Sequence, residues 1–81
     1  MIPRMITELV QGVTADPNVS FGKPCIAGTR VPVAVILGQL AGGVSEDEIC
    51  KEYDLTHEQI RAALRYAASL ASQEVVRVRA G

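Results

Sequence analysis

The sequence predicts a mainly α-helical domain built around a helix-turn-helix, with a small β element on its N-terminal side. Two helix-capping signals stand at Ser45 and Thr56, and a long helical periodicity follows the second. With 81 residues the chain is one domain. The predicted parts are an arm over 1–12, an extended segment over 13–33, a helical core over 33–73 and a tail over 74–81.

The N-terminal third carries turn signals in place of helical periodicity. Residues 1–11 are expected to form a loose arm or a short helical turn. Asp16-Pro17-Asn18 signals a turn, and β-branched residues precede it. Further on, Gly28 breaks a helix and Pro32 pushes Val31 out of the α region. Residues 25–33 are therefore expected to be extended, with one or two short strands there and an edge hairpin as one arrangement.

Two short helices are expected next. The first begins at Pro32 or Val33, because proline suits a first helical turn, and it ends at Gly42-Gly43. The second follows Ser45, whose capping-box partner is Glu48, and lasts about two turns.

The third helix is expected to be longer and runs over 57–73. Thr56 is its N-cap, and Gln59 stands at the capping-box position. Helical spacing gives this helix an inward apolar face, which consists of Ile60, Ala63, Leu64, Ala67 and Leu70 or Ala71. Its many alanines offer more small apolar surface than one face needs. Because so small a chain also has a marginal core, the sequence predicts a homodimer.

Two capped helices joined by about three residues have the geometry of a helix-turn-helix, whose second helix reads the major groove with its N-terminal part. Gln59 suits a bidentate contact with adenine, and an arginine suits guanine. Backbone N–H groups at Thr56 and His57 suit a phosphate. The same pattern also occurs as plain scaffold, in which Gln59 only closes its capping box. The predicted DNA-binding residues are Thr56, His57, Gln59, Arg61, Arg65 and Arg30.

The charge distribution keeps a second interpretation open. The formal net charge is −1, so bulk charge does not indicate a nucleic-acid partner. Residues 46–58 are strongly acidic with Lys51 as their one lysine, whereas the chain from Arg61 onward is mainly basic. An acidic second helix repels phosphate. The alternative is therefore a protein-binding scaffold module that does not bind DNA.

Other function classes lack their signals. Cys25 and Cys50 fit neither a zinc pattern nor a disulfide framework, and are expected to be small packed side chains in a reducing compartment. His57 is a lone histidine without a nucleophile or carboxylate partner at a catalytic spacing. No signal peptide or membrane span is visible. We expect a cytoplasmic, non-enzymatic protein without cofactor, metal, membrane partner or small-molecule substrate.

The most specific segment is Gly22-Lys23-Pro24-Cys25-Ile26-Ala27-Gly28-Thr29-Arg30-Val31-Pro32-Val33, which resembles the signature of the DUF433 family. Asp16-Pro17 before it and Leu40-Ala41-Gly42-Gly43-Val44-Ser45 after it also fit, and the resemblance extends over 13–71. One departure is Ala27, where members often carry a basic residue. Arg30 suits either a structural clamp on a carboxylate or helix end, or a phosphate contact.

The resemblance implies a homeodomain-like core of three helices with a small N-terminal β element. It also implies a VapB-like antitoxin that inhibits a PIN-like ribonuclease toxin and binds operator DNA for autoregulation. The alternating tail is then expected to bind this toxin, by adding a strand or by placing an arginine among the carboxylates of its metal site. The predicted partner-binding residues are Val75, Val76, Arg77, Val78 and Arg79.

Overall fold

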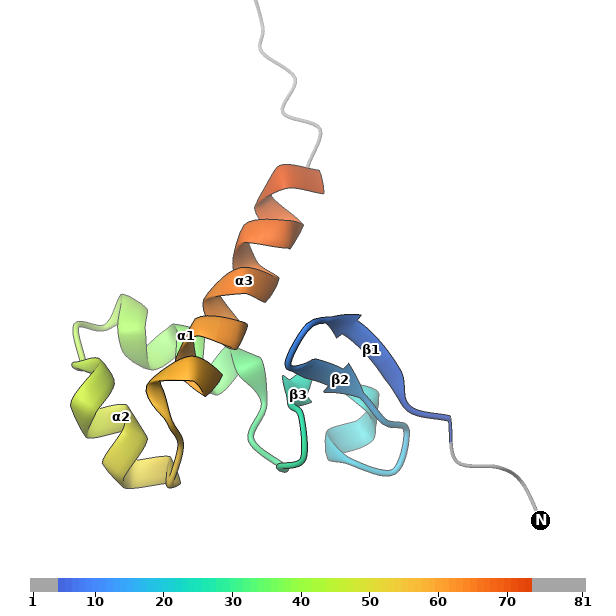
Figure 1. Ribbon diagram of the computed structural model, residues 1–81, viewed down its shortest axis with the longest axis horizontal. Helices are drawn as coiled ribbons and strands as arrows, with labels where there is room; N and C mark the ends of the chain where they lie inside the picture. Colours follow the sequence, from blue (N-terminus) through green and yellow to red (C-terminus); the bar gives the residue numbers. More distant parts are fainter. Residues whose placement is uncertain (1–4, 74–81) are drawn as a thin grey trace, which may run out of the picture.

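The structure, a computed structural model, describes residues 5–73 of the chain. Three helices stand beside a small sheet (Figure 1), so the mainly α prediction is confirmed. The partner-binding residues predicted in the tail lie outside the described residues. In chain order the elements are β1 (Thr7–Val10), β2 (Val13–Ala15), the 3-10 turn η1 (Ser20–Gly22), β3 (Cys25–Ile26), α1 (Val33–Ala41), α2 (Glu46–Tyr53) and α3 (His57–Gln73).

The sheet is antiparallel with strand order β1-β2-β3. Its first hairpin pairs Thr7 with Ala15 and turns through Gln11 and Gly12. The sequence analysis expected a loose arm or a short helical turn here, and the structure has an edge strand instead. A physical reason is that Val13, at 0% exposure, anchors the hairpin in the core while Gly12 takes a φ of +88° that suits the turn.

Within 25–33 the structure has β3 and a bridge between Cys25 and Pro32, and β2 precedes them with a turn in between. Val19 N–H donates to the backbone carbonyl of Asp16 at 2.9 Å, which closes the turn signalled by Asp16-Pro17-Asn18. β3 pairs Ile26 with Val13 and Cys25 with Thr14.

The helix boundaries match the capping signals. α1 begins at Val33 directly after Pro32, and Ser45 caps α2 by accepting the N–H of Glu48 at 3.2 Å. The cap of α3 is reciprocal: Gln59 N–H donates to Thr56 Oγ1 at 3.2 Å, and Thr56 N–H donates to Gln59 Oε1 at 2.8 Å. This reciprocal pair is the predicted capping box.

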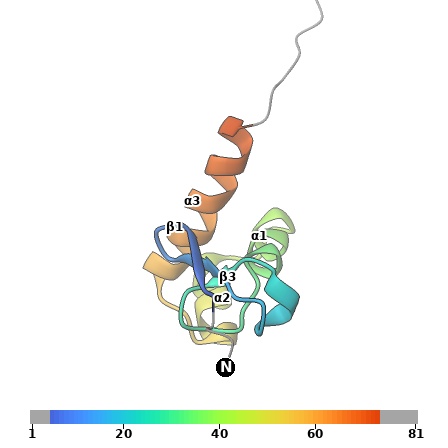
Figure 2. The same cartoon turned by 90° about the vertical axis from the view of Figure 1, so that its right-hand side faces the viewer.

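The core is aliphatic and lies where the first half of α3 meets α1, α2 and the sheet. α3 then continues beyond these elements and projects from the body, as Figures 1 and 2 show from two sides. The inward face predicted for α3 is therefore only partly buried: Ile60 and Ala63 are 0% exposed, but Leu70 is 46% exposed. The core cluster consists of Val13, Ile26, Val33, Ile36, Ile49, Leu55, Ile60, Ala62 and Ala63.

Within residues 5–73, none of the helices has the length and apolar character needed to cross a bilayer.

Candidate functional site

The surface around the start of α3 contains most of the predicted DNA-binding residues. Three residues, Asp54 to Thr56, connect α2 to α3, and Asp54 ends α2 with a left-handed φ of 56°. Thr56, His57 and Arg61 are exposed on this surface, and Gln59 is half-buried. The connection has the predicted length. A helix-turn-helix that reads DNA stays a prediction.

His57 is held by the acidic first turn of α2. Its Nδ1 lies 3.2 Å from Glu46 Oε1, and its Nε2 lies 2.9 Å from Asp47 Oδ1. All three side chains are largely exposed to solvent, and exposed pairs of this kind contribute little stability. In this conformation the ring faces α2, with both nitrogens engaged.

Gln59 serves the fold in the way that the scaffold interpretation expected. Its side-chain oxygen accepts the N–H of Thr56 at 2.8 Å and lies 3.3 Å from the Thr56 hydroxyl. A bidentate contact with adenine needs both the oxygen and the nitrogen of the amide. Such a contact would therefore require Gln59 to leave its capping position.

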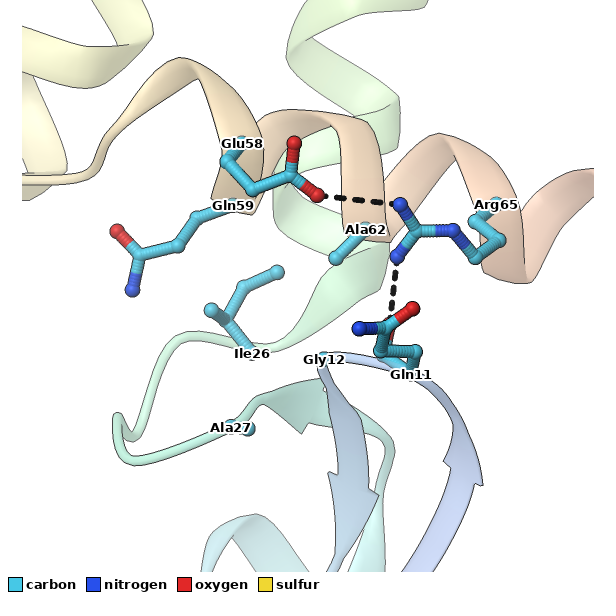
Figure 3. Close-up of a pocket in the computed structure, with 8 residues that line it drawn as sticks. All are labelled: Gln11, Gly12, Ile26, Ala27, Glu58, Gln59, Ala62 and Arg65. Atoms are coloured by element: carbon cyan, nitrogen blue, oxygen red, sulfur yellow. Dashed lines mark hydrogen bonds and ion pairs between the residues drawn. The ribbon is translucent and has the colours of Figure 1, made fainter.

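The two arginines of α3 differ in how the structure engages them. Arg65 Nη1 donates to the backbone carbonyl of Gln11 at 2.7 Å, and Arg65 Nη2 donates to Glu58 Oε2 at 3.1 Å (Figure 3). Arg61, by contrast, is 68% exposed and makes a 3.6 Å contact with the other oxygen of Glu58. Arg65 thus ties α3 to the β1–β2 turn, and Arg61 is the arginine that reaches solvent.

A hollow of about 200 Å³ lies beside this tie (Figure 3). The β1–β2 turn approaches α3 so closely that a Cβ added to Gly12 would stand 2.7 Å from the Cβ of Ala62. The hollow therefore marks the junction between the hairpin and α3. Its lining consists of Gln11, Gly12, Ile26, Ala27, Glu58, Gln59, Ala62 and Arg65.

Arg30 is not part of α3; it lies in the loop that joins β3 to α1. Its side chain is exposed, and its backbone carbonyl accepts a 3.5 Å bond from the Ser20 hydroxyl. The neighbouring Thr29 caps this loop locally: its hydroxyl donates to the Ile26 carbonyl at 2.8 Å and accepts the Val31 N–H at 3.0 Å. Thr29 therefore stabilises the conformation of this loop through both hydrogen bonds.

Negative charge gathers at the end of α3 that was predicted to read DNA. Glu46, Asp47 and Glu58 lie in the first turns of α2 and α3. The pKa of the nearby Cys50 thiol is raised, first by partial burial of the thiol and then by the negative charges of Asp47 and Glu46. This electrostatic environment favours a positively charged or neutral partner over a phosphate.

An exposed aromatic side chain is a feature that the sequence analysis missed. Phe21, the one phenylalanine of the chain, is 98% exposed and sits at a left-handed φ of 58°. Beside it, Met5 is 71% exposed, and both border a hollow of about 390 Å³. A lone Phe is ordinarily assigned to the core; the available signal was its place between Ser20 and Gly22, in a turn. Phe21 and Met5 therefore form a small exposed apolar patch.

Comparison with known proteins supports the resemblance seen in the sequence. The model of the family described as "Protein of unknown function (DUF433)" matches residues 13–67. Over 52 residues the chain is 36% identical to the Mycobacterium tuberculosis protein named "Putative antitoxin VapB45", covering 64% of this chain and 22% of that protein. The X-ray crystal structure of Rv2018 from Mycobacterium tuberculosis matches with a TM-score of 0.59 at 36% identity, over 64% of this chain and 24% of that chain. The chain thus spans about a quarter or less of the length of these relatives.

Proposed function

This chain belongs to the DUF433 family, and from that premise we propose that it is a non-enzymatic antitoxin of a type II toxin–antitoxin pair. Its partner is a PIN-like ribonuclease toxin, which it binds and inhibits in the cytoplasm. The observation that carries the proposal is the 36% identity to a protein named as an antitoxin. The family match over 13–67 includes β2, β3, α1, α2 and most of α3, so the resemblance concerns the folded core.

Two parts of the chain support a protein partner. The tail over 74–81 follows directly after α3 and alternates valine with arginine, a pattern suited to adding a strand or to placing a cation among carboxylates. Phe21 is the second: an exposed aromatic ring supplies a large contact area when a partner covers it.

We further propose that a homodimer binds operator DNA through α2 and α3 and so regulates its own synthesis. The reciprocal cap at Thr56 and the short connection before it support this part, because they fix the start of α3 relative to α2. Arg61 is exposed on the outer side of α3 and is suited to a phosphate or a guanine.

The alternative is a protein-binding module that does not bind DNA. Glu46, Asp47 and Glu58 favour it, because these carboxylates crowd the end of α3 that would approach the phosphate backbone.

Ribonuclease inhibition tests the antitoxin proposal. The proposed PIN-like toxin partner is assayed on RNA with rising amounts of the full chain. The wild type is expected to stop cleavage near a fixed ratio, and both deletion of 74–81 and Phe21→Asn should weaken inhibition. Undiminished cleavage in the presence of folded wild-type protein would overturn the proposal.

An electrophoretic shift on the chain's own upstream DNA, at two salt concentrations, separates the two alternatives. Arg61→Ala should weaken a specific shift that also weakens with salt. Arg61→Lys is the matched control, because it keeps the charge and removes the planar pair of donors that a guanine contact needs. A shift that Arg61→Lys fully restores reflects charge alone, and no shift at either salt concentration favours the protein-binding module.

A further inference from the structure

The outer half of α3 differs in composition from the rest of the chain. Residues 67–73 contain no charged side chain, although 21% of the whole chain is charged. This half of the helix projects beyond the elements that cover its first half (Figures 1 and 2). An exposed, uncharged helical segment is unusual on a surface that needs only to face water.

An apolar groove runs along this part of α3. Tyr66 and Leu70 form one wall, and Ala34 and Leu37 of α1 form the other. The groove has a volume of about 280 Å³, with Pro24, Pro32 and Val33 in its lining and Lys23 as its one charged residue. Leu70 and the nearby Leu64 are 46% and 42% exposed, so the described part of the chain leaves them partly uncovered.

We propose that a second copy of this chain covers the groove, with the two α3 helices crossing at a two-fold axis and Leu70 of each copy seated in the groove of the other. The inference deepens the homodimer of the proposed function and rests on that part of it. It does not depend on the identity of the toxin or on DNA binding.

The absence of charge on the outer half of α3 is compatible with a second copy as the occupant. In a two-fold interface each residue near the axis meets its own copy, so any charge there would meet a like charge. The outer half of α3 satisfies this condition, because 67–73 is uncharged. Ala67 and Ala71 lie one helical turn apart and let two helix backbones approach closely.

The area of this surface sets the strength of the dimer. A standard stable interface uses roughly 20–30 residues on each side. The groove and the outer half of α3 supply fewer residues than this on each side. The dimer is therefore expected to be weak and to dissociate on dilution.

Sedimentation equilibrium of the full chain over a concentration series tests the inference. The wild type should pass from dimer to monomer on dilution. Leu70→Glu should raise the dissociation constant by at least about 30-fold, because it places two carboxylates at the axis. Leu70→Met, of similar volume, should retain the dimer. Leu9→Glu is the matched control, since Leu9 on β1 is 40% exposed and lies outside the groove.

Far-UV circular dichroism and thermal melting check that each variant is folded; Leu70 lies outside the buried core cluster, so its substitution should preserve both signals. A wild type that is monomeric at every concentration overturns the inference, as does a Leu70→Glu variant that dimerises like the wild type. The inference is also overturned if the wild type is monomeric and forms a 1:1 complex with the ribonuclease that Leu70→Glu abolishes. That result would assign the groove to the ribonuclease. Ribonuclease inhibition by the wild type, measured separately, shows whether the antitoxin proposal stands when the dimer does not.

Discussion

Arg65 Nη1 donates a 2.7 Å hydrogen bond to the backbone carbonyl of Gln11, a residue 54 positions earlier in the chain. The second terminal nitrogen, Nη2, donates at 3.1 Å to Oε2 of Glu58, which lies seven residues earlier on the same helix. A planar guanidinium suits this double role, because its donors point in fixed directions. The contact fastens the β1–β2 hairpin to α3, and so the sheet and the helix pair form one body.

Removing this tie should cost stability. Arg65→Ala is expected to lower the free energy of unfolding by about 1–2 kcal/mol, the range of a charge-assisted hydrogen bond reduced by partial exposure. Arg61→Ala is the matched control and should change it by less than about 0.5 kcal/mol, because Arg61 makes only an exposed contact. Urea unfolding followed by circular dichroism measures both. Equal effects of the two substitutions would contradict the structural role given to Arg65.

The close approach of the hairpin to α3 leads to a second prediction. Gly12→Ala adds a Cβ 2.7 Å from Ala62 at a φ of +88°. Left-handed backbone costs a non-glycine residue about 1–2 kcal/mol, and overpacking a filled site costs about 1–3 kcal/mol more. The substitution should therefore destabilise the chain by at least about 2 kcal/mol.

Gly28→Ala separates the two costs. Gly28 has a similar φ of +77°, but a Cβ there meets nothing within 4 Å. Its substitution should cost only the backbone strain of about 1–2 kcal/mol. Thermal or urea unfolding of both variants gives the comparison. If Gly28→Ala is as damaging as Gly12→Ala, steric contact with Ala62 is not what sets the cost at Gly12.

The sequence predicted the helices well because their signals are local. Ser45 and Glu48, and likewise Thr56 and Gln59, are three positions apart. Thr56 and Gln59 form the full reciprocal box that this spacing indicates, and Ser45 with Glu48 forms the half in which Ser45 Oγ accepts the Glu48 N–H. β1 was missed for the opposite reason. Its position depends on contacts across the fold, such as the tie of Arg65 to the turn, and no spacing within the first twelve residues announces them.

The candidate site shows the same division. Helical spacing left Arg61 and Arg65 off the inward apolar face of α3, and Arg61 is indeed exposed. Arg65 is long enough to reach back over the hairpin, which spacing alone does not reveal. The exposure of Phe21 follows from the left-handed turn at 20–22, for which its neighbours Ser20 and Gly22 were the available signal.

Cys50 provides a prediction about pH. Partial burial is the first cause of its raised thiol pKa, and the carboxylates of Asp47 and Glu46 add to it. The folded thiol therefore keeps its proton to a higher pH than the unfolded one. At lower pH both are protonated and the thiol has no effect; as pH rises through the ordinary thiol range, the unfolded chain ionises first and stability falls.

Alkylation with iodoacetamide, resolved by mass spectrometry of the Cys50 peptide, checks this shift. The thiolate is the reacting species, so folded Cys50 should react more slowly than the unfolded chain at mildly alkaline pH. Asp47→Asn should speed the reaction, and Glu52→Gln on the same helix should leave it unchanged. A rate that is insensitive to Asp47→Asn would contradict the part assigned to Asp47 and leave burial and Glu46 as the causes of the raised pKa.

Phe21 should be a site where substitution stabilises the protein. Its φ of 58° carries the strain of left-handed backbone, and with 98% exposure the ring gains no burial in return. Asparagine tolerates this conformation better than other non-glycine residues. Phe21→Asn is therefore expected to raise the free energy of unfolding by about 0.5–1 kcal/mol. Phe21→Ala is the control: it keeps the strain and should change stability little. Thermal melting of both variants decides the matter, because a loss of stability in Phe21→Ala would mean that the ring packs against the fold.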